Sequence, residues 1–130
     1  MYFSQEEKGN VIEQRDCVVR SIATAFNINY RKAHAHCKEL GREDNRGFNM
    51  QTALNRKQGN SSWFLFDKFV QYYHLEKRIT LGTFIKKYST GTYIMRVYRH
   101  ALVIQDGKIL DSTNPNSRIK EYFKILDKLI

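Results

Sequence analysis

Three residues of this chain, Cys17, His100 and Asp111, have side chains that together can perform nucleophilic chemistry. A cysteine becomes a strong nucleophile once a histidine has taken its proton, and an aspartate can hold that histidine in the required orientation. Free cysteines are also common as small apolar core residues, so Cys17 alone leaves that alternative open. Whether the three side chains can meet depends on the elements that carry them.

Cys17 lies where a helix is predicted to begin. The segment EQRDCVVRSIATAF predicts a helix of about residues 16–27, and Asp16 is a suitable N-cap for its first turn. The unpaired N–H groups and the dipole at this end of a helix stabilise a thiolate. The buried face of the helix is predicted from apolar residues spaced four apart, with a second row beside it: Val18, Ile22 and Phe26, then Val19 and Ala23.

His100 and Asp111 lie near the two ends of a predicted β-hairpin. Asp106-Gly107 is a strong turn signal between the runs ALVIQ and KILDS. A two-residue turn pairs the strands antiparallel, which puts Asp111 opposite Leu102 and on the same face of the sheet as His100. An aspartate at the end of the second strand can therefore orient the imidazole.

The rest of the chain predicts helices first and strands afterwards. Residues 30–40 read as a helix capped by Gly41, a short helix is expected over 50–58, and Thr80 is expected to cap another. For the aromatic segment 63–73 we favour helix over part of its length and a core position over a substrate-groove wall. Strands are predicted near 92–98, 101–105 and 108–112, and the alternation in IKEYFKI suggests one more strand, although a helix fits nearly as well. This order predicts an α+β fold.

Length and composition indicate one folded domain over residues 1–130, because 42% of the residues are apolar and 13% aromatic. The net charge of +9 favours nucleic acid, an anionic membrane surface or an acidic protein as a partner. Two cysteines do not make a disulfide scaffold, so a reducing, cytoplasmic setting is expected. No signal peptide or membrane-spanning segment is expected either.

Four segments, DCVVRSIATAF, TLGTF, GTYIMRVYRH and QDGKILDS, occur in an order that resembles papain-like cysteine peptidases. These sequence motifs most resemble those of small uncharacterised phage proteins of that superfamily. The resemblance covers the two ends of the chain, and residues 42–79 match weakly. It implies a papain-like fold, with N-terminal helices packed on a C-terminal antiparallel sheet. Cys17 would be the nucleophile, His100 the base and Asp111 the orienting residue.

One position departs from the pattern of that superfamily. Papain-like enzymes usually carry a glutamine about six residues before the cysteine, where it helps to stabilise the oxyanion, but residue 11 here is valine. Gln14 or Asn10 could take that role, with the backbone N–H of Cys17 as the second donor. Alternatively, the oxyanion hole is incomplete and the chain has lost its activity.

The implied function is that of a cysteine hydrolase (peptidase, isopeptidase or amidase) that acts on a peptide or protein substrate without metal or cofactor. Acyl transfer to an amine is a third possibility, because the same residues can pass an acyl group to an amine. If the chain is phage-encoded, we expect it in the host cytoplasm. The alternative is an inactive papain-like fold that binds an acidic host protein or nucleic acid through its basic surface. A metal site at His34, His36 and Cys37 is conceivable, but the sequence offers no second pair of ligands.

Overall fold

Residues 3–9, 15–50 and 70–126 are described by the computed structural model, in which helices precede an open antiparallel sheet. Before the sheet, the described residues form the helices α1 (Gln5–Lys8), α2 (Cys17–Phe26) and α3 (Tyr30–Glu39). The sheet region contains β1 (Val70–Thr80), α5 (Leu81–Lys87), β2 (Thr92–Val97), β3 (His100–Gln105), β4 (Lys108–Ile109) and β5 (Arg118–Ile125). The α+β class expected from the sequence is confirmed.

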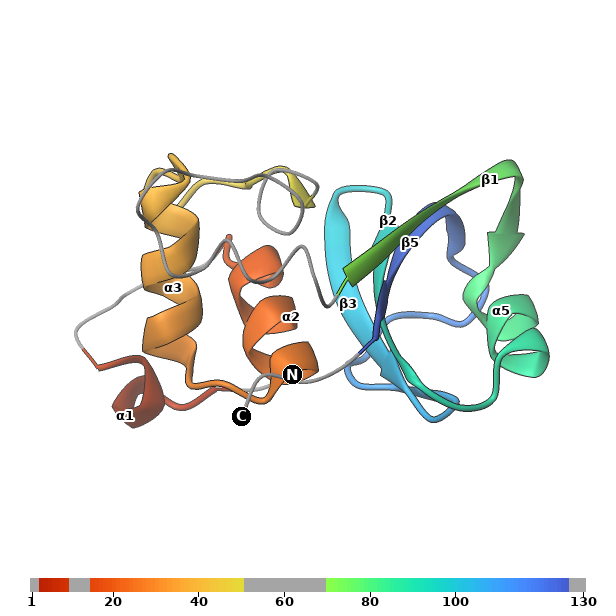
Figure 1. Cartoon of the computed structure of the whole chain (residues 1–130), viewed down its shortest axis with the longest axis horizontal. Coiled ribbons are helices and arrows are strands. Elements are labelled where there is room, and N and C mark those ends of the chain that lie inside the picture. Colours follow the sequence, from red (N-terminus) through yellow and green to blue (C-terminus); the bar gives the residue numbers. More distant parts are fainter. Residues whose placement is uncertain (1–2, 10–14, 51–69, 127–130) are drawn as a thin grey trace.

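The five strands pair in the order β1-β5-β2-β3-β4, and every neighbouring pair is antiparallel. Helices cover both faces: α2 and α3 lie on one side of the sheet, and α5 lies on the other (Figure 1). β3 is the strand against which α2 packs. Cys17 is the first residue of α2 and His100 is the first residue of β3, so this packing brings together the elements that carry two of the three residues named above.

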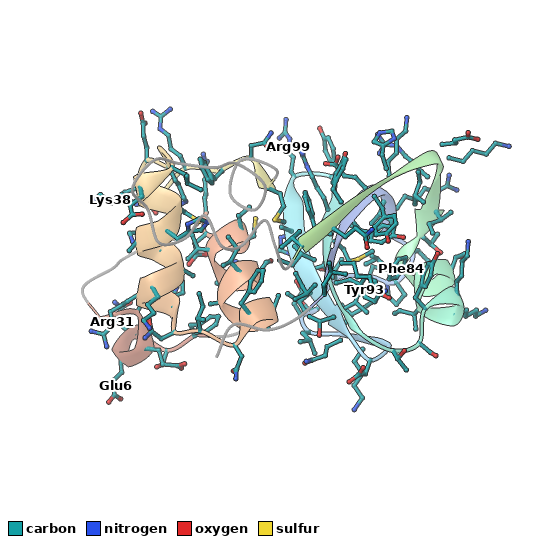
Figure 2. All side chains as sticks on the ribbon, viewed as in Figure 1. Glu6, Arg31, Lys38, Phe84, Tyr93 and Arg99 are labelled. Atoms are coloured by element: carbon teal, nitrogen blue, oxygen red, sulfur yellow. The ribbon has the colours of Figure 1, made fainter. Side chains whose placement is uncertain are left out.

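Two apolar clusters fill the space on the two faces of the sheet. The α2 side contains the predicted helix face together with alternate strand residues: Val18, Val19, Ile22, Ala23, Phe26, Ala101, Val103 and Phe123. The α5 side contains Phe84, Tyr93, Leu102, Ile104 and Tyr122. Phe84 and Tyr93 meet edge to face with their ring centroids 4.9 Å apart (Figure 2). The sheet is therefore buried on both faces, and this fixes the register of its strands.

Local signals set several of the boundaries that the sequence predicts. Asn27 adopts the left-handed conformation at the end of α2, and the side chain of Asn29 then accepts the N–H of Lys32 at the start of α3. The Thr80 hydroxyl accepts the N–H of Thr83 and caps α5, as expected. The helix predicted over 50–58 lies outside the described residues after Met50.

Two segments resolve the choice between helix and strand. IKEYFKI is part of β5, which confirms the reading as a strand. Of the aromatic segment 63–73, only residues 70–73 are described, and they belong to β1, so the helix expected over part of the segment does not include them. Residues 63–69 lie outside the described part of the chain. β1 is an edge strand with a largely exposed middle, and its pairing with β5, rather than an apolar period of its own, makes it a strand.

The hairpin between β3 and β4 has the predicted register. Gln105 pairs with Lys108, and both turn residues have positive φ, 49° at Asp106 and 79° at Gly107. This combination is what a two-residue turn of the favoured type requires. A second two-residue turn joins β2 to β3, where Arg99 has φ of 56° and Val97 pairs with His100.

Candidate active site

His100 and Asp111 are in direct contact. The Nε2 atom of His100 lies 2.8 Å from Oδ2 of Asp111. The other carboxylate oxygen of Asp111, Oδ1, accepts the backbone N–H of Thr113 at 2.8 Å. Both oxygens are thus engaged, so the carboxylate is fixed in position when it meets the imidazole.

Asp111 reaches His100 from a position that differs from the expected one. The sequence predicts Asp111 at the end of the second hairpin strand, but β4 ends at Ile109. The backbone N–H of Leu110 still donates to the carbonyl of Val103, and the chain then turns away from the sheet. The strand is shorter because Asp111 uses its side chain to hydrogen-bond the backbone two residues later, which favours a turn over a strand.

Cys17 is the first residue of α2, and its half-buried thiol hydrogen-bonds to the His100 side chain. The backbone N–H of Ala101 hydrogen-bonds to the same sulfur. Because Nε2 of His100 is directed to Asp111, Nδ1 is the ring nitrogen that remains for the thiol. The three residues named from the sequence therefore converge in the order thiol, imidazole, carboxylate.

The contact between thiol and imidazole is made at the end of the sheet. Strict alternation along β3 would direct His100 to the side of Leu102, which packs with α5, whereas Ala101 packs with α2. Cys17 and His100 can still meet because each is the first residue of its element, and α2 packs along β3.

The surroundings of Cys17 favour its thiolate. Burial, the largest influence, raises the pKa of the thiol, but the hydrogen bonds from His100 and Ala101 lower it, as do the charges of His100 and Arg20. The net result is a pKa below the ordinary value. A hydrogen bond to the charged form and a nearby cation are the two effects that activate cysteine nucleophiles.

The pKa of His100 is raised and that of Asp111 is lowered. The hydrogen bond with Cys17 is the largest influence on His100 and raises its pKa; burial opposes this, and Asp111 raises it further. For Asp111, burial raises the pKa, but hydrogen bonds from His100 and Thr113 hold it below the ordinary value. Each of the three shifts thus favours the charged form of its group, which is the thiolate, the imidazolium or the carboxylate.

A pocket of about 760 Å³ opens beside the thiol. Cys17 and His100 both line it, together with apolar side chains that include Phe48 and Met50. The nucleophile and its base therefore face a space in which a substrate group can bind, instead of being enclosed in the core.

The first turn of α2 is arranged differently from the prediction for Asp16. Asp16 occupies the N-cap position of α2, as predicted, and its backbone carbonyl accepts the N–H of Arg20, but the predicted capping hydrogen bond to its side chain is absent. Its buried carboxylate instead binds Arg20 at 2.9 Å, accepts the hydroxyl of Tyr30 at 2.6 Å and lies 3.3 Å from Lys8. Two cations and a hydroxyl attract the carboxylate more strongly than a backbone amide does.

The backbone N–H of Cys17 is available to donate a hydrogen bond to an oxyanion. Among the described residues it makes no hydrogen bond, as expected for the first position of a helix without a side-chain cap. Both side chains named as candidates for the second donor, Gln14 and Asn10, lie outside the described residues.

The second cysteine has a different environment. Cys37 is completely buried in α3, and this burial raises its pKa to about 12. No group of three or more potential metal ligands occurs within residues 3–9, 15–50 and 70–126. His34, one member of the conceivable metal site, lies 3.6 Å from a carboxylate oxygen of Asp44.

Sequence reasoning missed two contributors to the site. The N–H of Ala101 reaches the sulfur of Cys17 because it follows His100 directly, and no side-chain pattern reports such a backbone donor. Arg20 lies one helical turn after Asp16, and this spacing of opposite charges on a predicted helix is a signal that could have identified the pair.

The chain matches no protein-family model, no curated protein and no solved structure. In the part of the chain that the structure describes, no helix has both the length and the apolar character needed to cross a bilayer.

Proposed function

We propose that this chain is a cysteine hydrolase with a papain-like arrangement of Cys17, His100 and Asp111, and that it cleaves an amide, isopeptide or thioester bond. The observation that carries the proposal is the continuous chain of hydrogen bonds from the Cys17 thiol through His100 to Asp111, with 2.8 Å between imidazole and carboxylate. A thiol that is only a core residue needs neither an oriented base nor access to a pocket.

The proposed reaction has two steps. The Cys17 thiolate attacks the carbonyl carbon, the bond to the leaving amine breaks, and the imidazolium of His100 gives its proton to that amine. Water then attacks the resulting thioester while His100 takes a proton from it, and the acid and the free thiol are released. Asp111 keeps the Nε2 proton of His100 directed to itself, which leaves Nδ1 to exchange protons at the sulfur.

Stabilisation of the tetrahedral oxyanion would come from backbone N–H groups near the sulfur. The N–H of Cys17 points out of the first turn of α2, where the helix dipole also favours negative charge. From the sequence, Gln14 and Asn10 are the candidates for a second donor, a side-chain amide that would hydrogen-bond the same oxyanion.

The acyl-enzyme itself provides the test. Incubation with p-nitrophenyl acetate should release a burst of p-nitrophenol and leave an acetyl group on Cys17, which mass spectrometry of a digest detects. His100→Ala should slow acylation by about 100-fold or more, the usual contribution of a general base. Cys37→Ser is the matched control and should leave the burst unchanged.

Turnover after the burst separates the possible outcomes. Continued release of acetate indicates a hydrolase, whereas product that accumulates only as an amide after addition of a primary amine indicates acyl transfer. If Cys17 acquires no acetyl group, or does so equally fast in His100→Ala, the proposal is wrong and a binding function without chemistry is favoured.

A further inference from the structure

The pocket beside Cys17 carries an excess of positive charge. Among the described residues, its lining includes four arginines, Arg15, Arg20, Arg96 and Arg99, and no aspartate or glutamate. A low-dielectric wall with charges of one sign concentrates counter-ions and steers them into the pocket. The lining thus selects for ligands of negative charge.

Two of these arginines already form ion pairs with carboxylates of this chain. Arg20 binds the buried carboxylate of Asp16 at 2.9 Å. Arg96 binds Oε1 of Glu121, also at 2.9 Å. Their positions are set by these pairs, so they contribute less to the attraction of a further anion.

Arg15 and Arg99 have no carboxylate partner among the described residues, and both are exposed. Arg99 directly precedes His100, in the left-handed position of the β2–β3 turn. Its guanidinium lies 5.2 Å from the centre of the Tyr98 ring, which restricts its orientation. In Figure 2, Arg99 is at the hairpin end of the sheet, on the side where α2 begins.

Arg15 precedes Cys17 by two residues and also lines the pocket. Of the two arginines that have no carboxylate partner among the described residues, one therefore precedes the nucleophile by two residues and the other directly precedes the base. A carbonyl group bound for attack by Cys17 lies in the pocket whose lining includes both arginines.

From this placement we propose that the substrate is an acidic peptide, with an aspartate or glutamate side chain near the bond that is cleaved. The proposal rests on the function proposed above and specifies its substrate class. Arg15 and Arg99 would act as specificity residues, since a guanidinium pairs with a carboxylate through two parallel hydrogen bonds. Nucleic acid fits the charge but not the chemistry, because it offers the thiolate no acyl carbon to attack.

Two small electrophiles of different charge test the pocket without knowledge of the substrate. Iodoacetate and iodoacetamide alkylate the same sulfur, but only iodoacetate is an anion. The rate constant of iodoacetate divided by that of iodoacetamide, both measured at Cys17, reports the local electrostatic potential. At low ionic strength this ratio should fall about threefold in Arg99→Ala, and similarly in Arg15→Ala. Arg99→Lys should retain most of the ratio, because the positive charge remains.

Lys86→Ala is the matched control. It removes one positive charge from the exposed surface of α5, on the side of the sheet opposite to α2 (Figure 1), and should leave the ratio unchanged. His100 is unchanged in all these variants, so its contribution to the attraction of iodoacetate is common to them and the differences between them isolate the arginines.

Protection of Cys17 from iodoacetamide then identifies the kind of anion. A blocked tetrapeptide of glutamate should slow alkylation more than its glutamine counterpart, and this difference should shrink in the Arg15→Ala, Arg99→Ala double variant. Protection by single-stranded oligothymidylate but not by the glutamate peptide would overturn the proposal in favour of nucleic acid.

The two proposals fail in different ways. If Cys17 reacts with iodoacetamide no faster than Cys37, the hydrolase itself is rejected. Cys17 could instead be activated while the ratio of the iodoacetate to the iodoacetamide rate constant is the same in Arg15→Ala, Arg99→Ala and the unaltered chain. In that case only the acidic substrate is rejected.

Discussion

The imidazole of His100 is held between a thiol and a carboxylate, with its Nε2 atom 2.8 Å from Oδ2 of Asp111. The side chain of His100 is about one-third exposed and that of Asp111 about one-fifth, so the pair is partly shielded from solvent. Shielding strengthens the interaction, while the remaining access lets a substrate approach. The pair also fixes which ring nitrogen faces Cys17.

The first prediction concerns the selectivity between the two cysteines. A short pulse of iodoacetamide near neutral pH should label Cys17 well before Cys37, because one pKa is lowered and the other is raised to about 12. His100→Ala should slow the labelling of Cys17, and Asp111→Asn should slow it less, since the carboxylate acts through the imidazole. Mass spectrometry of the digested protein measures both sites in one sample.

Unfolding would expose both thiols, so circular dichroism of each variant serves as the control for this experiment. Equal labelling of Cys17 and Cys37 in the folded chain would contradict the prediction. So would labelling of Cys17 that does not respond to His100→Ala.

The second prediction is a shift in pH dependence. A lowered pKa means that the Cys17 thiolate persists at a pH where an ordinary cysteine is protonated, so its alkylation should rise at lower pH than that of glutathione. His100→Ala removes a hydrogen bond and a positive charge, both of which lower the thiol pKa, so the midpoint should move to higher pH. Rate constants with iodoacetamide from pH 5 to 10 at constant ionic strength would check this. A midpoint equal to that of glutathione in the unaltered chain would contradict it.

The hairpin with His100 could be predicted because its determinants are local. Asp106 and Gly107 satisfy the positive φ values of a two-residue turn, and that turn fixes the register on both sides. The proximity of His100 and Asp111 follows from this register. The end of β4 could not be predicted, since it depends on the competing hydrogen bond from Thr113 to Asp111.

Other features depend on residues that are distant in the sequence. Asp16 looks like a helix cap when only its neighbours are considered, but Lys8 and Tyr30 reach it through the tertiary fold. β1 has no clear apolar period, and it forms a strand because residues 118–125 pair with it. The meeting of Cys17 with His100 also depends on how α2 packs on β3, so the sequence could only suggest it.

The third prediction concerns the packing of α2. Phe26 is completely buried in the cluster between α2 and the sheet, so Phe26→Ala should lower the free energy of unfolding by roughly 3–5 kcal/mol, the usual cost of removing a large core side chain. Urea denaturation followed by circular dichroism measures the loss. Tyr98→Ala is a suitable control, because Tyr98 is 79% exposed and its truncation should cost about 0.5 kcal/mol or less. An unchanged midpoint for Phe26→Ala would exclude α2 from the core.

The last prediction concerns Asp16, whose buried carboxylate holds Arg20, Lys8 and Tyr30 at the start of α2. Breaking a fully buried ion pair costs about 3–5 kcal/mol, but Lys8 and Arg20 are partly exposed, so we expect Asp16→Ala to cost about 2–3 kcal/mol. Asp16→Asn should cost less, because an amide oxygen can still accept the Tyr30 hydroxyl although the charge is lost.

The comparison for Asp16 is the ion pair of Glu43 with Arg46, which has a similar distance of 3.2 Å but side chains that are 72% and 74% exposed. Solvent screens such a pair, so Glu43→Ala should change the free energy of unfolding by about 0.5 kcal/mol or less. Urea titrations of the three variants side by side then measure the effect of burial at nearly equal distance. If Asp16→Ala and Glu43→Ala cost the same, the Asp16 carboxylate does not stabilise the start of α2, and the helix that presents Cys17 must be held by its apolar face alone.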